Sequence, residues 1–166
     1  MMVIKDINRI SFFQDLDNNE YALLKDIFTV EHFEKDEEIF HQESKAEYFY
    51  ILSSGKVVIR YKPYDGPALV VARIQSGGVF GWSAMLRRDV YTSDAIADEK
   101  SIAFRVKGSE LLALCAKHPE SGAVIMQRLA NIISERLEGT HAEILKIFRN
   151  GMDLSNECWK RMIENE

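Results

Sequence analysis

The pattern of apolar and polar residues divides the chain into three parts, and the first part is helical. Between residues 8 and 29, apolar residues recur at helical spacing, starting with Ile10, Phe13 and Leu16. This spacing predicts one or two short helices. Asn18 or Asn19 can cap the second one, because Asn side chains accept hydrogen bonds from first-turn amides. Its apolar face would carry Leu23, Leu24, Ile27 and Phe28.

The second part changes to short segments rich in β-branched and aromatic residues, separated by turn residues. Within residues 56–61, charged residues alternate with Val57, Ile59 and Tyr61, which is the period of a strand with one buried face. Many short strands at near-regular spacing predict an antiparallel barrel or jelly roll. The predicted strands are residues 30–33, 38–40, 47–52, 56–61, 68–74, 91–97 and 101–106.

The third part is helical again. Ser109 can cap a helix over residues 110–117, and Pro119 suits the start of another. From residue 123 onward, seven of eight positions in a seven-residue repeat are apolar, which favours a coiled-coil homodimer. The alternative is one long helix packed on its own barrel. The expected dimer contact comprises Met126, Ala130, Ile133, Leu137, Thr140, Ile144 and Ile147, and a second apolar line, Leu129, Ile132, Leu145 and Phe148, would face the same subunit.

Composition narrows the class of protein. A chain of 166 residues with 46% apolar residues has room for one domain with a real core. The net charge of -5 argues against a nucleic-acid-binding surface over the whole chain. No apolar run is long enough to span a membrane, and the first residues lack a signal-peptide core, so we expect a cytoplasmic location and no membrane partner.

A glycine-rich bend interrupts the strands. Gly77, Gly78 and Gly81 fall within five residues, and residues 82–86 can form one helical turn. A bend that opens into a helix presents unpaired backbone N–H groups, which suit an anion. Thr92 and Ser93 would return the chain as a strand, with hydroxyls close to the same place. Such bends also occur at ordinary barrel corners, so the spacing alone leaves both interpretations open.

The order of these elements, together with specific residues, resembles the cyclic-nucleotide-binding domain of the catabolite activator/FNR family. The similar residues are 33–35, 39–42, 48–58, Gly77 and the pair Phe80-Gly81 that would open the phosphate-binding cassette. The resemblance spans about residues 10–150. It implies a mainly β fold with flanking helices. Residues 1–118 would form N-terminal helices and a double-stranded β-helix (jelly roll), residues 119–150 a long dimerisation helix, and residues 151–166 a short tail or helix, with no DNA-binding domain in this chain.

Two departures from the family concern the ligand. Trp82 stands where members that bind cyclic nucleotides usually have a glutamate for the ribose, and Tyr91 stands where they have an arginine for the phosphate. Arg87 and Arg88 lie nearby in sequence and are candidate substitutes for that arginine; the alternative is a solvated pair in a loop. The candidate binding residues implied by the cassette and the long helix are Phe80, Gly81, Trp82, Ser83, Ala84, Tyr91, Thr92, Ser93 and Thr140. Asp36 and Glu43 replace glycines that are common in the family's turns.

No set of residues predicts catalysis or a metal site. The histidines at 32, 41, 118 and 141 show no His-x-His or His-Glu-x-x-His spacing, and the Ser and Asp residues form no nucleophile motif. We therefore expect a non-enzymatic protein with no metal.

The sequence thus predicts an effector-binding regulatory module, with cAMP, cGMP or another small anionic or aromatic molecule as ligand. Two alternatives stay open. The chain can be the effector domain of a transcription regulator truncated before its helix-turn-helix, since only 15 residues follow Gly151. It can also be a dimerisation scaffold without a ligand.

Overall fold

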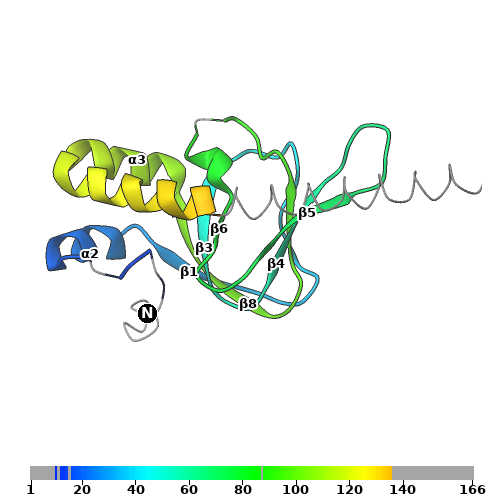
Figure 1. The fold of residues 1–166 in the computed structure, drawn as a ribbon, viewed down its shortest axis with the longest axis horizontal. Helices are drawn as coiled ribbons and strands as arrows, with labels where there is room; N and C mark the ends of the chain where they lie inside the picture. Colours follow the sequence, from blue (N-terminus) through cyan, green and yellow to red (C-terminus); the bar gives the residue numbers. More distant parts are fainter. Residues whose placement is uncertain (1–9, 11, 15, 87, 136–166) are drawn as a thin grey trace, which may run out of the picture. The chain divides into compact units, whose positions relative to one another are not determined.

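The computed structural model describes residues 10, 12–14, 16–86 and 88–135. The chain divides into two units, Met1–Ile132 and Ile133–Glu166. The contacts discussed below all lie within the first unit. Figure 1 shows the strands wrapped into a roll, with the helices gathered at one end of it.

The strands form two four-stranded sheets, ordered β1-β8-β3-β6 and β2-β7-β4-β5, with every neighbouring pair antiparallel. This confirms the predicted mainly β jelly roll with flanking helices. The elements are α2 (Asn18–Lys25), β1 (Thr29–Phe33), β2 (Glu38–Phe40), β3 (Tyr48–Ser54), β4 (Val57–Tyr61), β5 (Leu69–Ile74), β6 (Val79–Phe80), the 3-10 turn η1 (Trp82–Ala84), β7 (Asp94–Ala97), β8 (Ser101–Lys107), α3 (Gly108–Lys117) and a helix over residues 119–135.

The core lies inside the roll and combines aromatic rings with small side chains. Tyr50 and Phe80 from the first sheet meet Val57 and Ile59 from the second. Ala95, Ala97 and Ala103 are fully buried, which lets the two sheets approach around the larger rings.

Several element ends differ from the sequence-based expectation because backbone partners decide them. Asp17, not Asn18 or Asn19, caps α2: its carboxylate accepts from the Glu20 amide, and the Glu20 side chain accepts from the Asp17 amide. Helix α3 begins at Gly108 without a side-chain cap, so the predicted cap by Ser109 is wrong.

Two strand predictions also need correction. Thr92 and Ser93 form a bend, and β7 begins only at Asp94. In β4, Val58 is buried although it lies on the expected polar face, whereas the Tyr61 side chain is 42% exposed. Strand β4 is flanked by both β5 and β7, and its Tyr61 end leads into the exposed turn before β5.

The helix of residues 119–135 has two different faces. Ile125 and Leu129 are buried, and the Arg128 guanidinium donates to the carbonyl of Gln14, which fastens this helix to the N-terminal segment. Met126 and Ala130, two of the predicted dimer residues, are exposed. The predicted seam residues 137, 140, 144 and 147 lie outside the described part of the chain.

Gly108, the first residue of α3, lies against the 3-10 turn η1. A Cβ atom at this position would lie 2.3 Å from the Ala84 carbonyl oxygen, and the Gly108 amide donates to Glu47 at 2.9 Å. A side chain here would therefore force η1 and α3 apart.

We expect Gly108→Ala to lower the free energy of unfolding by about 1–3 kcal/mol, because overpacking shifts the backbone. Urea denaturation measures it. Gly66→Ala is the control, since its Cβ would meet only a Pro63 side-chain carbon, at 3.0 Å. Equal stability of the two variants would contradict the close contact.

Candidate functional site

The glycine bend forms the predicted hinge. Gly81 adopts a left-handed conformation with φ of 74°, and η1 follows at once. A Cβ atom on Gly81 would lie 2.8 Å from the Tyr48 carbonyl oxygen and 3.0 Å from the Tyr50 ring. Both the backbone angle and the space therefore require glycine here. The prediction of a bend that opens into a helical turn is confirmed.

Tyr91 closes the space beside this hinge. Its side chain is only 3% exposed, and its hydroxyl donates to the Tyr48 carbonyl at 2.8 Å and accepts from the Tyr48 amide at 3.0 Å. Strand β6 pairs with β3 only at Tyr50 and Ile51, so it does not reach Tyr48. The phenol thus replaces a strand partner at the edge of β3.

The Tyr91 ring also belongs to a stack of aromatic side chains. It lies on Phe40 with the ring centroids 3.8 Å apart and the planes 12° apart. Phe40 contacts Tyr50 and Phe80, and these two rings are themselves stacked with centroids 4.9 Å apart. Aromatic side chains therefore fill the interior beneath Gly81.

The other predicted binding residues lie around this cluster with differing exposure. Ser83 and Ala84 are buried in η1, Trp82 and Ser93 are half-buried, and Thr92 is exposed. The Ala84 amide, expected to face a ligand, donates to the Gly81 carbonyl at 3.2 Å. Thr140 and Arg87 lie outside the described residues. Their contribution to a site stays a prediction, as does that of the whole set.

Two arginines lie near the cassette, Arg105 and Arg88. Arg105 lies 4.3 Å above the Tyr48 ring and pairs with Glu31 at 2.8 Å. Arg88 is exposed and lines a cleft of about 810 Å³ together with Lys45 and Lys107, on the side of η1 that faces α3.

Burial raises the pKa of Tyr91, although the hydrogen bond from the Tyr48 amide opposes part of this shift. Burial also raises the pKa of Tyr50, and the neighbouring Tyr91 phenol adds to it. Both phenols are thus neutral at physiological pH and can offer a ligand no charge.

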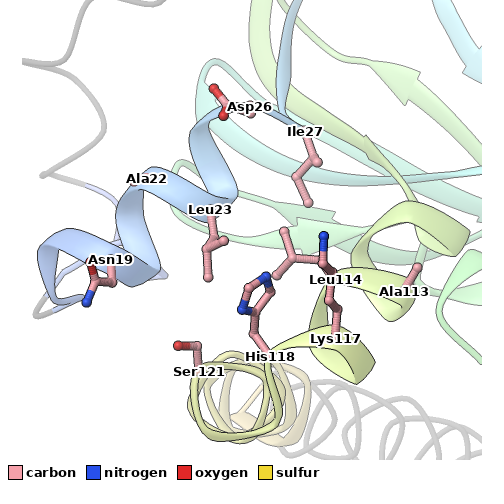
Figure 2. Close-up of a pocket in the computed structure, with 10 residues that line it drawn as sticks. All are labelled: Asn19, Ala22, Leu23, Asp26, Ile27, Ala113, Leu114, Lys117, His118 and Ser121. Carbon is pink, nitrogen blue, oxygen red and sulfur yellow. The ribbon is translucent and has the colours of Figure 1, made fainter.

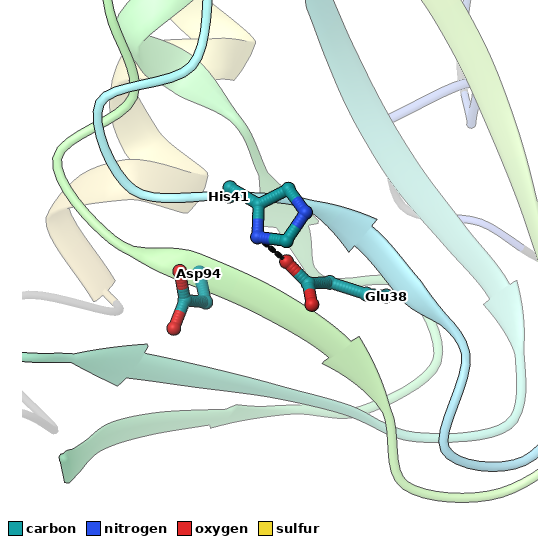
Figure 3. Close-up of side chains that lie close together, drawn as sticks. All are labelled: Glu38, His41 and Asp94. Atoms are coloured by element: carbon teal, nitrogen blue, oxygen red, sulfur yellow. Dashed lines mark ion pairs between the residues drawn. The ribbon is translucent and has the colours of Figure 1, made fainter.

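Two further features were not found from the sequence. A cleft of about 740 Å³ lies between α2 and the two later helices. Figure 2 shows five of the residues that line it: Leu23, Ile27, Leu114, His118 and Ser121. Figure 3 shows Glu38, His41 and Asp94 close together. The Glu38-x-x-His41 spacing was a visible signal, but Asp94 comes from a strand more than fifty residues later.

Comparison with known proteins agrees with this geometry. The family described as "Cyclic nucleotide-binding domain" matches residues 30–118, more than half of the chain. The chain belongs to this family. Among the described residues, no helix is long and apolar enough to cross a membrane.

The domain is similar to parts of larger proteins. It is 27% identical over 99 residues to human cGMP-dependent protein kinase 2, which covers 58% of this chain and 13% of the kinase. The chain therefore spans about one eighth of the length of that curated relative.

Solved structures share the fold of the domain. The Thermus thermophilus catabolite activator protein superposes with a TM-score of 0.66 at 23% identity, over 82% of this chain and 62% of that one. The regulatory subunit of a cAMP-independent protein kinase A from Trypanosoma brucei gives 0.64 at 20% identity, over 77% and 46%. A triple mutant of that subunit is described as bound to cAMP.

Removing the Tyr91 hydroxyl tests its structural role in the domain. We expect Tyr91→Phe to lower the free energy of unfolding by about 1–3 kcal/mol, because two buried backbone groups of Tyr48 lose their partner. Urea denaturation measures the change. Tyr61→Phe, at a side chain 42% exposed, should stay within about 0.5 kcal/mol of the unaltered chain. A Tyr91→Phe variant of full stability would refute the role.

The raised tyrosine pKa values predict a loss of stability in alkali. Tyr50 and Tyr91 hold their protons more tightly in the folded than in the unfolded chain. Their contribution to stability is therefore complete below about pH 10 and is lost as the pH rises further. Denaturation midpoints at about pH 8 and pH 11 should show the decline. Tyr91→Phe should reduce it, whereas Tyr64→Phe, at a fully exposed side chain, should not. Equal declines in both variants would exclude Tyr91 as a source.

Proposed function

We propose that this domain is a regulatory, effector-binding module whose cassette does not hold a cyclic nucleotide through the usual arginine–phosphate pair. The observation that carries the proposal is the buried Tyr91 phenol, with its hydroxyl committed to the Tyr48 backbone. The effector is a small anionic or aromatic molecule. Catalysis has no part in this function.

The absence of an arginine at position 91 supports an effector other than a cyclic nucleotide. An arginine offers a phosphate two charge-assisted hydrogen bonds, whereas a phenol offers one neutral bond. The loss amounts to about 2–4 kcal/mol, or roughly 30- to 1000-fold in affinity. In this domain the single phenol hydrogen is also donated to Tyr48 already, so a phosphate would have to displace that bond.

The proposed effector lies over η1. The Ser83 side chain and the amides at the start of the turn face its polar group, and the half-buried Trp82 ring stacks on its apolar part. Thr92 and Ser93, in the bend before β7, supply further hydroxyls. Thr140, which lies outside the described residues, stays a predicted binding residue.

Contact between the turn and α3 supports a regulatory function. Gly108 lies against Ala84, so a shift of η1 on ligand binding must move the start of α3 or break the contact. The ligand then favours one of two packings of the later helices. We propose that the chain forms a homodimer through the predicted seam that begins at Met126 and Ala130. This homodimer would respond to the effector, and its location would be the cytoplasm.

A second candidate is the effector domain of a larger transcription regulator. The similarity to the catabolite activator protein favours it, because this chain covers 62% of that protein's length. The regulatory subunit of the cAMP-independent kinase instead offers a precedent for this fold without a cAMP response. In its cAMP-bound triple mutant, one of the substitutions introduces an arginine.

Calorimetry with cAMP and cGMP tests the proposal. We expect no micromolar binding by the unaltered chain. The double variant Trp82→Glu, Tyr91→Arg should gain affinity by at least about tenfold, because it restores the charged partners of the ribose and phosphate. Tyr91→Phe is the matched control, since it removes the hydroxyl and adds no charge.

The outcomes separate the alternatives. Micromolar binding of either nucleotide by the unaltered chain would overturn the proposal. A gain by the double variant alone supports a pocket altered only in its ligand-contacting residues. No gain in a variant that folds normally by circular dichroism would mean that the pocket itself has diverged, which favours the scaffold function.

A further inference from the structure

Glu38, His41 and Asp94 bring three potential metal ligands together on the surface of the second sheet. One carboxylate oxygen from each acid and one imidazole nitrogen all lie within 4.8 Å of one another. Figure 3 shows the His41 ring turned toward the Glu38 carboxylate, with Asp94 on the neighbouring strand. His41 Nδ1 and Glu38 are in direct contact.

The strand pairing positions this group. Strand β2 pairs with β7, and the register shifts between Glu38 and Phe40. Glu38 lies opposite Ile96, and Phe40 lies opposite Ala95, so the residue just beyond Phe40 comes close to Asp94. Glu38 and His41, at the end of β2, thus lie next to Asp94 of β7, although Asp94 is distant from them in sequence.

Hydrogen bonds outside the group hold Asp94 in place. Its Oδ1 accepts from the Gln42 amide at 2.7 Å. The Gln42 side chain in turn accepts from the Lys62 amide at 2.9 Å and donates to the Lys62 carbonyl at 3.1 Å. Metal-binding carboxylates commonly have such outer hydrogen bonds, which fix the orientation of the ligand.

The Arg60 side chain does not form an ion pair with this group of three residues. Arg60 lies opposite Asp94 in β4, yet no ion pair joins them among the residues described. The group carries two carboxylates and one imidazole, and Glu38 and His41 are exposed to solvent. An ion can therefore approach without a change in the fold.

We propose that Glu38, His41 and Asp94 bind a divalent cation of the zinc class. One imidazole nitrogen with two carboxylate oxygens suits Zn²⁺ or Co²⁺ better than Mg²⁺ or Ca²⁺, which prefer oxygen ligands alone. Water completes the coordination on the open side. The ion links the end of β2 to β7. Its ligands Glu38 and His41 flank Phe40, the residue on which Tyr91 is stacked.

Titration of the chelator-treated full chain with Co²⁺, followed by visible absorption, tests the site, and calorimetry with Zn²⁺ repeats it. We expect one ion per chain. His41→Ala and Asp94→Asn should each weaken binding at least about tenfold. Asp94→Asn keeps an oxygen for the Gln42 amide, so the fold should survive. His32→Ala, an exposed histidine on β1, is the matched control and should leave the affinity unchanged.

Three results would overturn the proposal: no saturable binding at millimolar Co²⁺, equal affinity of His41→Ala and the unaltered chain, or a thiolate-to-cobalt absorption band that assigns the ion to a cysteine. Circular dichroism of each variant separates a lost ligand from a lost fold. The site does not depend on the proposed effector, so its test and the nucleotide test can fail separately.

Discussion

The hydrogen bonds between the Tyr91 hydroxyl and the backbone of Tyr48 are the interaction on which the cassette depends. Strand β6 leaves β3 at Gly81, because η1 begins there, and the next backbone groups of β3 need other partners. A single phenol satisfies both the carbonyl and the amide of Tyr48. The Tyr91 side chain therefore replaces the backbone partners that β3 lacks where β6 ends.

These hydrogen bonds restrict what the cassette can bind. A tyrosine held by the backbone and stacked on Phe40 is a structural residue, whereas an arginine at the same place would bring a charge that only a bound anion could neutralise. The family fold is kept because Gly81 and the aromatic core specify it. Ligand chemistry can then change without a loss of the roll, since the two depend on different atoms.

The sequence was sufficient where a residue type has one local consequence. The glycine at 81 predicts the bend found there. The alternation in residues 56–61 predicts strand β4, although not its buried face, and the apolar spacing predicts α2, although Ile27 and Phe28 lie beyond its end. It was insufficient where the partner comes from elsewhere in the chain. Nothing local indicates that the Tyr91 hydroxyl binds Tyr48, that Asp17 outcompetes Asn18 as a cap, or that Asp94 lies beside His41. These contacts follow from strand register, which the resemblance to a family gives only in outline.

Glu43 illustrates how such distant contacts can support an unfavourable local geometry. It has a left-handed backbone with φ of 67°, which costs a residue with a side chain about 1–2 kcal/mol relative to the usual conformation. Its amide donates to the Tyr91 carbonyl at 2.8 Å, and the Tyr91 amide donates to Ser44 at 2.9 Å. The turn around Glu43 therefore holds the backbone of Tyr91, while Tyr48 holds its side chain. Relaxing Glu43 would break the bond that places Tyr91 against β3, so the strained turn and the closed cassette must persist together.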